Sequence, residues 1–179
     1  MRAIRNFLTA TRGNMSAEAA LILPLLFWAF IATFALFDAF RQQNVAMKAS
    51  YSVADMISRE TEALTAADID GLNGVFDYLT FSNHPSWIRV TSIRWDQNDN
   101  RFEVNWSHAT KDHDALTTAT LQDRKEIIPA MAVGDSVVLL ETYMIYEPIF
   151  RVGLDASWTA NAVVTRPRFA SQVVFDPTS

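Results

Sequence analysis

The sequence predicts an α+β fold, in which a long N-terminal transmembrane helix continues into an outer domain with a small antiparallel sheet. Three observations predict this fold. A nearly unbroken apolar block lies near the N-terminus of the 179 residues. Residues 38–62 then continue without glycine or proline, which favours an extension of the same helix. Farther along, segments that alternate between polar and apolar residues are separated by turn residues, a pattern typical of hairpin strands.

Composition narrows the possible function classes. The formal net charge is −5, which argues against nucleic acid as a partner, because nucleic-acid binding rewards clustered Lys and Arg. The chain has no cysteine, so disulfides, zinc–thiolate sites and cysteine nucleophiles are excluded. An outer domain would therefore gain its stability from packing alone.

Charge is distributed unevenly along the chain. Residues 1–13 contain Arg2, Arg5 and Arg12 and no acidic residue. Without them Lys+Arg falls from 15 to 12 while Asp+Glu stays at 20, so the remainder carries a formal charge of −8. Such asymmetry at a terminus is typical of a targeting segment. We therefore expect a basic leader over 1–13, a transmembrane helix over 14–40 and an outer domain over 41–179.

The apolar run Ala19–Phe37 has no charged side chain. At about 1.5 Å rise per residue it spans roughly 28 Å, close to a hydrocarbon core of about 30 Å. One alternative is a buried helix of a soluble domain, which normally carries a polar stripe. Another is a cleaved secretory signal, but no Ala-x-Ala triplet follows the run before residue 50. A membrane anchor fits best, and the positive-inside rule keeps its N-terminus in the cytoplasm.

A glycine stands just before this run. Gly13 lies five residues before Glu18, at the start of the membrane segment. The arrangement resembles a type IV prepilin cleavage motif, in which an intramembrane aspartyl peptidase cuts after the glycine. The cut would fall between Gly13 and Asn14. Glycine suits a scissile position because it has no Cβ and lets the peptidase approach the backbone closely.

Glu18 places a carboxylate at a membrane boundary, where a charge costs about 2.5–3.5 kcal/mol if it reaches the helix centre. Such a residue usually has a partner, and here it also complements the positive end of the helix macrodipole. In pilins, the glutamate at this position is understood to attract the free N-terminal amine of a neighbouring subunit. The resemblance therefore implies subunit pairing through Glu18. The alternative is a flanking acid that extends into the headgroups.

The segment from Glu18 to Leu26 is similar to the start of the TadE-like family, the minor pilins or pseudopilins of the Tad (tight adherence) system, which assembles Flp pili. Weaker similarity recurs at 134–138, 143–148 and 166–168. The resemblance implies a pilin-like domain and a role in assembling a pilus for surface adherence. It also implies an inner-membrane location with the domain in the periplasm. The implied partners are other pilins and minor pilins, the prepilin peptidase and the Tad assembly platform.

Two helical features are expected after the anchor. A narrow stripe of residues at three-to-four spacing predicts that the long helix packs on the domain. The stripe comprises Ala46, Ala49, Val53 and Met56. Thr65 and Asp68 form a capping signature before a second helix that should end near residue 79. Its expected apolar face comprises Leu72, Val75, Phe76 and Leu79.

Two strands are expected at 87–95 and 101–107, joined by turn residues over 96–100. The second strand alternates well, so its apolar side chains should face one way; they are Phe102, Val104 and Trp106. The first changes phase between Val90 and Ile93, which suggests a bulge. The turn also resembles a Ca²⁺ loop, but Arg101 stands where such a loop needs glycine. We therefore expect a plain hairpin turn.

The remaining elements are a short helix near 118–128 and strands at 136–146 and 157–166, with a helical turn over 148–154. A possible metal set matches no standard spacing, so we expect a solvated loop there. It comprises His108, Asp112, His113 and Asp114.

No motif for catalysis or phosphate binding occurs in the chain. We therefore expect a protein that is not an enzyme, with no catalytic residues, no metal and no cofactor. The alternative is an unprocessed, single-pass anchored binding module or enzyme, whose polar residues converge only in the fold.

Overall fold

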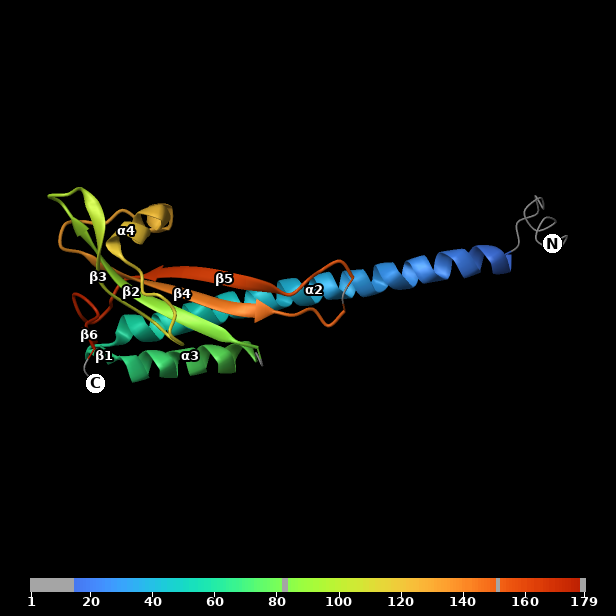
Figure 1. Cartoon of the computed structure of the whole chain (residues 1–179), viewed down its shortest axis with the longest axis horizontal. Helices are drawn as coiled ribbons and strands as arrows, with labels where there is room; N and C mark the ends of the chain where they lie inside the picture. Colours follow the sequence, from blue (N-terminus) through green and yellow to red (C-terminus); the bar gives the residue numbers. More distant parts are fainter. Residues whose placement is uncertain (1–14, 82–83, 151, 178–179) are drawn as a thin grey trace. The chain divides into compact units, whose positions relative to one another are not determined.

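The computed structural model describes residues 15–81, 84–150 and 152–177. The α+β class, the long apolar N-terminal helix and the small antiparallel sheet are confirmed (Figure 1). In chain order the elements are α2 (Met15–Arg59), β1 (Leu64–Thr65), α3 (Ala66–Thr80), β2 (Ser86–Asp96), β3 (Arg101–Ala109), α4 (Thr118–Leu121), the 3-10 helix η1 (Gln122–Ile127), β4 (Ser136–Tyr146), β5 (Ser157–Thr165) and β6 (Phe175–Asp176).

The chain divides into two compact units. The first comprises the chain up to Ala39 together with Pro148–Asp155. The second comprises Phe40–Glu147 and Ala156–Ser179. Helix α2 therefore contributes to both units, and the segment between β4 and β5 belongs with the first part of the helix.

Helix α2 is 45 residues long and continues through Pro24 without interruption. In its second half the predicted stripe is largely confirmed, because Ala46, Ala49 and Val53 are at most 3% exposed. Met56 was a wrong prediction: it is 42% exposed, and Ile57 is buried instead. After Val53 the stripe continues with a step of four residues, because an α-helix turns once every 3.6 residues.

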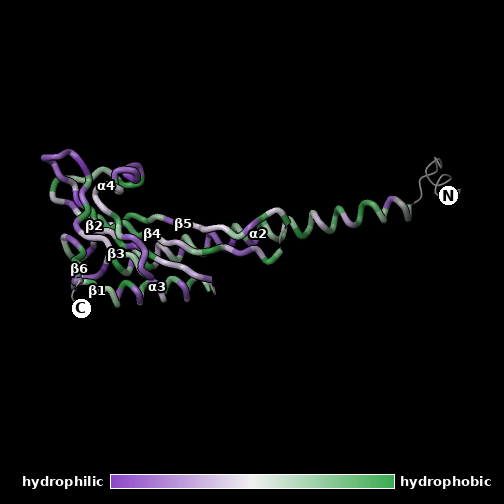
Figure 2. Tube along the Cα trace, viewed as in Figure 1, coloured by the Kyte–Doolittle hydropathy of each residue, from purple (hydrophilic) through white to green (hydrophobic). Residues whose placement is uncertain are grey.

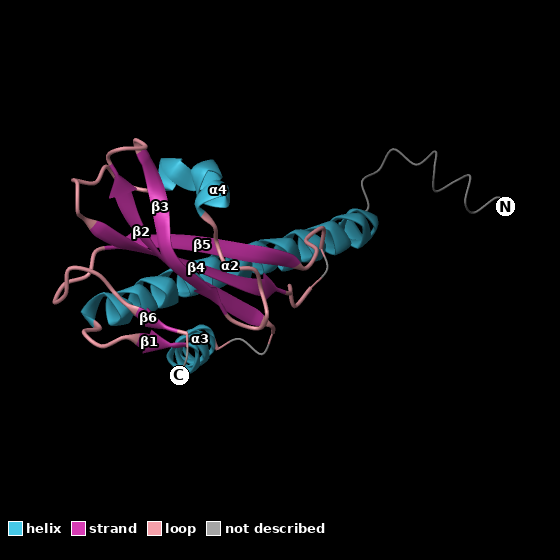
Figure 3. Ribbon diagram, turned by 60° about the vertical axis from the view of Figure 1, so that its left-hand side comes forward, coloured by secondary structure: helices cyan, strands magenta, loops and turns pink. Residues whose placement is uncertain are grey.

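The main sheet has the strand order β3-β2-β4-β5 and is antiparallel throughout (Figure 3). Helices cover both of its faces. One hydrophobic cluster lies between the sheet and helices α2 and α3, and includes Val53, Phe76 and Leu140. A second lies between the opposite face and the α4–η1 region, and includes Leu121 and Leu139. Burial on both faces explains why β4 is buried without alternation from Ser136 to Thr142.

The bulge lies where the phase change suggested, but its extra residue is in β3. Ser92 pairs with Trp106 and Ile93 pairs with Val104, which leaves Asn105 without a counterpart on β2. The pairing of β2 with β4 is continuous across the same position. The phase change in β2 therefore reflects the burial of both faces, not a distortion of that strand.

The bulge separates side chains that were expected to face the same way. Phe102 and Val104 pack with the second cluster, and Trp106 packs with the first. The prediction of a common face was wrong, because one extra residue turns every later side chain to the other face. The indole of Trp106 is partly buried, and its Nε1–H donates to the carbonyl of Val173 at 2.8 Å.

A second, two-stranded sheet was not predicted. Strand β1 pairs with β6 in parallel, with Leu64 opposite Phe175. The ring of Phe175 stacks on Trp106 with their centroids 5.2 Å apart. The C-terminal segment is also tied to the end of α2, since Arg168 N–H donates to the carbonyl of Ser58 at 2.7 Å. These contacts join segments that are distant in the sequence, which local patterns do not reveal.

The capping box before α3 is confirmed. Asp68 N–H donates to the Thr65 hydroxyl at 3.1 Å, and Thr65 N–H donates to the Asp68 carboxylate at 2.9 Å. The hydrogen bond from the Thr65 side chain lowers the pKa of Asp68 below its ordinary value. The helix ends at Thr80, and Phe81 follows in the left-handed region with φ of 52°.

The prediction of a helical turn over 148–154 was wrong, because the described residues there form bends. Val152 N–H donates to the carbonyl of Phe150 at 3.0 Å, which closes a three-residue turn. Gly153 then adopts φ of 96°, which ends any right-handed helix.

The two edges of the main sheet differ. At β3, the Thr118 hydroxyl accepts from Val104 N–H at 3.2 Å, and Gln122 Nε2 donates to the carbonyl of Phe102 at 2.9 Å. Strand β5 has no charged residue and pairs with β4 in unbroken register. Within the described ranges, no side chain hydrogen-bonds to the backbone of β5.

The stripe on α2 gives the first prediction. Replacing Ile57 by Ala should lower the free energy of unfolding by about 2–5 kcal/mol, because Ile57 is fully buried and would leave a cavity. Met56→Ala, one residue away, should change it by less than about 0.5 kcal/mol. Chemical denaturation of the full chain in detergent, followed by tryptophan fluorescence, measures both. Equal effects of the two substitutions would contradict the observed stripe.

Candidate functional site

The first turn of α2 carries Glu18, the residue assigned to subunit pairing. Its side chain is exposed, so its carboxylate is accessible on the helix surface. A negative charge at this end of a helix is favourable because it complements the macrodipole. Gly13 and Asn14, the residues assigned to cleavage, lie outside the described residues.

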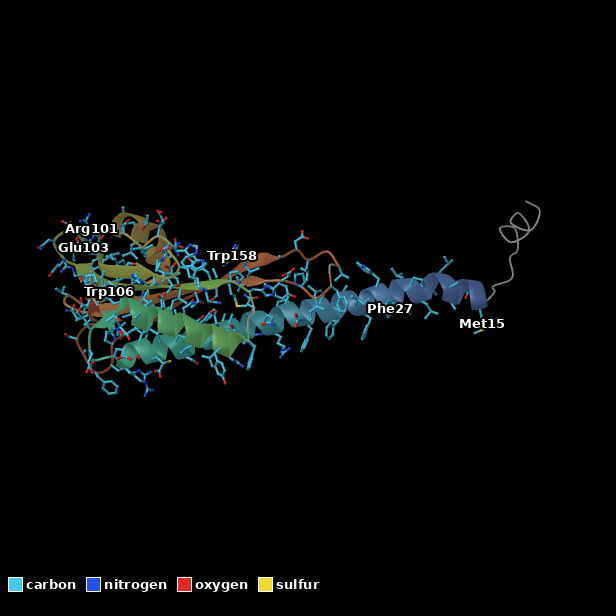
Figure 4. The ribbon with its side chains drawn as sticks, turned by 60° about the horizontal axis from the view of Figure 1, so that its bottom comes forward. Met15, Phe27, Arg101, Glu103, Trp106 and Trp158 are labelled. Atoms are coloured by element: carbon cyan, nitrogen blue, oxygen red, sulfur yellow. The ribbon has the colours of Figure 1, made fainter. Side chains whose placement is uncertain are left out.

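Apolar residues predominate along the first part of α2 (Figure 2). Their bulky side chains are exposed over many turns. Within the described ranges, α2 is the one helix long and apolar enough to cross a membrane, judged by length and composition. Only 6% of its most apolar stretch is buried, and Phe27 is 67% exposed (Figure 4). A continuous apolar surface of this kind normally contacts lipid or other proteins. Other side chains that are 59–79% exposed are Leu21, Leu23, Leu25, Leu26, Phe30 and Phe37.

A buried ion-pair cluster lies on the sheet face that α4 and η1 cover. Arg89 Nε–H donates to Glu141 Oε2 at 2.7 Å, and its Nη1 donates to the carbonyl of Asp114 at 3.1 Å. Glu141 Oε1 pairs with Arg124 and accepts from the Tyr143 hydroxyl at 3.1 Å. Both carboxylate oxygens are thus engaged. We call Arg89, Arg124, Glu141 and Tyr143 the Glu141 cluster.

The Glu141 cluster joins three segments that are distant in sequence. Arg89 lies on β2, Glu141 on β4 and Arg124 on η1. Glu141 is 1% exposed and Arg89 is 7% exposed, so each charge depends on the other for compensation. Burial lowers the pKa of Arg124, but its hydrogen bond to Tyr143 and the charge of Glu141 outweigh this effect and raise it. A carboxylate so fully engaged serves to hold the covering segment on the sheet.

Aromatic rings extend the cluster toward the solvent. Trp87 stacks between Tyr143 and His113, with centroid distances of 3.9 Å and 4.0 Å. His108 lies against the other face, where its ring stacks on Phe175 at 5.2 Å. The two histidines are therefore separated by the sheet and do not form a shared metal site. The loop at 111–115 is exposed, as expected.

Acidic residues gather at the hairpin between β2 and β3. Oxygens of Asp96, Asp99 and Glu103 lie within 4.8 Å of one another. Arg101 pairs with Asp99 at 2.7 Å and with Glu103 at 3.2 Å, and Arg94 pairs with Glu103 at 2.8 Å. The hydrogen bond from Arg94 is the main cause of a lowered pKa for Glu103. The two arginines thus pair with Asp99 and Glu103.

A hairpin turn joins β2 and β3, as predicted. The Asp96 carboxylate accepts from Asn98 N–H at 2.7 Å, which is typical of Asx-turn geometry. Asn100 supplies the positive φ of 48° that returns the chain into β3.

A hollow of about 650 Å³ opens beside this hairpin, between residues 94–98, the turn at 133–136 and residues 171–172. Two of its charged side chains are engaged in pairs, since Arg94 contacts Glu103 and Asp135 contacts Arg166 at 3.3 Å. The latter pair joins two of the segments that carry the weaker family resemblance. Both pairs are exposed, so they add little to stability.

Sequence reasoning missed the Glu141 cluster. One signal was present, because Arg89 and Glu141 each interrupt a strand rich in apolar residues, and such charges are rarely buried unless paired. Their pairing depends on the register of β2 with β4, in which they lie opposite one another. Only that register, which the sequence did not predict, brings the two residues together.

The described residues thus offer two distinct features. The first part of α2 is an apolar surface with one acid at its start, suited to lipid or to other helices. The Glu141 cluster stabilises the α+β domain that follows this part of the helix in the sequence. Comparison of the chain with family models, curated proteins and solved structures finds no match in any of the three.

The Glu141 cluster gives the second prediction. Glu141→Leu should cost about 3–5 kcal/mol of the free energy of unfolding, because it leaves the buried Arg89 charge uncompensated. The double variant Arg89→Met/Glu141→Leu should recover most of this loss, since an apolar pair needs no compensation and Arg124 is 38% exposed and can turn to water. Denaturant titration of the full chain in detergent gives both values. Additive losses in the double variant would show that the charges do not depend on each other.

Proposed function

We propose that the chain is a minor pilin or pseudopilin that takes part in assembling a Tad-type pilus for surface adherence. It is anchored in the inner membrane, with its N-terminus in the cytoplasm and its α+β domain in the periplasm. The observation that carries this proposal is helix α2. One uninterrupted helix exposes an apolar stretch in its first part and packs a stripe of small residues on a sheet in its second part.

On this proposal the two parts of α2 have separate tasks. The apolar part holds the subunit in the bilayer before assembly and contacts other subunits afterwards. The packed part belongs to the outer domain, where its stripe of small residues lies against the sheet. The resemblance at residues 12–40 and the basic leader support this assignment over an anchored enzyme.

Cleavage after Gly13 would release the amine of Asn14 and leave Glu18 as the fifth residue of the mature chain. In a neighbouring subunit this amine would meet the Glu18 carboxylate. The attraction is strong where water is excluded, because the effective dielectric constant is low there. Glu18 is exposed and therefore accessible for such a contact.

Processing gives the third prediction. Protein isolated from its native host should lack residues 1–13, and intact-mass measurement detects this directly. Gly13→Val should remain full length, because a branched side chain at the scissile position obstructs the peptidase. Finding only the full-length wild-type chain, or a chain that begins beyond residue 35, would contradict cleavage after Gly13.

Assembly gives the fourth prediction. Glu18→Ala should leave folding and processing intact but abolish pilus-dependent attachment, because it leaves the neighbour's amine unpaired. The loss of one partner costs roughly 3–5 kcal/mol, which lowers an assembly equilibrium by about two to four orders of magnitude. Glu18→Gln should be nearly as damaging, since it keeps the shape and loses the charge. Attachment assays with immunoblots for level and processing measure this.

The matched control is Glu60→Ala, an exposed acid just after the end of α2. It should attach as the wild type does. If the Glu18→Ala protein is present, processed and fully supports attachment, Glu18 is a flanking acid and the pairing mechanism is wrong.

A further inference from the structure

We infer that the segment Pro148–Phe150, between β4 and β5, is a lipid contact that enters the outer interface of the bilayer beside helix α2. Ile149 and Phe150 are the side chains that touch lipid. The inference rests on the membrane anchoring in the proposed function and adds a second point of attachment, independent of pilus assembly.

The segment packs on the apolar part of α2. The rings of Phe34 and Phe150 meet edge to face with centroids 6.4 Å apart. Ala35 is 3% exposed, although Phe34 and Leu36 on either side are each 47% exposed. Before residue 40, α2 shares its compact unit only with Pro148–Asp155. The contact therefore involves a residue within the apolar run itself.

The position of Phe34 in the run sets the depth of the contact. Phe34 lies three residues before Phe37, where the run ends, which is about 4.5 Å along the helix axis. In a spanning helix that depth is where acyl chains meet the headgroups, and aromatic side chains are favoured there. A segment held against Phe34 is therefore held at the same depth.

The exposed side chains of the segment are bulky and apolar. Ile149 is 67% exposed and Phe150 is 44% exposed, despite the contact of Phe150 with the helix. Exposed acidic residues flank the connection between β4 and β5, with Glu147 directly before the segment and Asp155 five residues after Phe150. The chain turns back at Gly153, whose φ is 96°. This is the pattern of a chain that dips into an apolar layer and returns to water.

The choice of lipid over a protein partner follows from the neighbouring surface. Phe37, at the end of the run, is 68% exposed, and Phe30 on the preceding turns is 69% exposed. In an anchored subunit that has not yet assembled, the bilayer around the helix covers these rings. Phe150 lies at the same level of the same surface, so the same lipid covers it.

The chain has no cysteine, so a single introduced cysteine can be labelled selectively. Ile149→Cys in the full chain is labelled with an environment-sensitive fluorophore and reconstituted into vesicles of phosphatidylethanolamine and phosphatidylglycerol. Spin-labelled lipids, with the quencher near the headgroup or near the chain end, report depth. The label at 149 should be quenched severalfold more by the shallow probe than by the deep one.

Two further labels are the controls. Phe27→Cys lies in the middle of the run and should respond mainly to the deep probe. Val133→Cys is a matched apolar position on a turn of the other unit, 62% exposed, and should respond to neither probe. Circular dichroism and tryptophan fluorescence check that each variant is folded.

The outcomes separate the inference from the proposed anchoring. If 149 is quenched no more than 133 while 27 is quenched by the deep probe, the anchor stands and the lipid contact is wrong. If 27 is not quenched, the anchor itself fails, and the contact with it. If 149 is shielded from aqueous iodide but not reached by lipid probes, another protein surface covers the segment and the inference is overturned.

Discussion

The close approach of α2 to the sheet is the constraint on which the rest of the domain depends. Its stripe consists of small side chains, so the helix can lie near the strands, and the hydroxyls of Ser50 and Thr142 meet across the interface at 2.7 Å. Helices α2 and α3 cover only one face of the sheet, and the opposite face is apolar as well. The chain therefore needs a second cover, which α4 and η1 provide. The Glu141 cluster holds that cover in place, at the cost of burying charges that must remain paired.

Features set by local chemistry could be predicted from the sequence. The capping box at Thr65 and Asp68, the hairpin turn after Asp96 and the limits of β4 all depend on residues within a few positions of one another. The position of Glu18 at the start of a long apolar helix could also be predicted, because a long run of apolar residues indicates a helix by itself. Cleavage after Gly13 stays a prediction, since that residue lies outside the described part of the chain.

Features set by contacts between distant segments could not be predicted. The parallel pairing of β1 with β6 depends on where the C-terminal segment returns, and nothing near Leu64 announces it. The bulge lies in β3 because that strand, and not β2, contains the extra residue. The apolar pattern of β2 does not show this, because both faces of that strand are buried. The partners of Glu141 depend on strand register in the same way. In the last two cases the sequence shows an anomaly, a phase change or a charge, without showing its partner.

The unequal edges of the main sheet limit how copies of the chain can stack. If sheets of identical molecules were placed side by side in the same orientation, the β5 edge of one would meet the β3 edge of the next. The two strands at such a junction would run antiparallel, because strand direction alternates along the order β3-β2-β4-β5. The backbone at β3 already bonds to Thr118 and Gln122, so each junction would have to break two hydrogen bonds before forming its own. Continuous fibre growth through these edges is opposed at every step, although β5 alone, uncharged and regular, has the features of an aggregation-prone strand. The short helical cover at β3 therefore opposes edge-to-edge association of identical sheets.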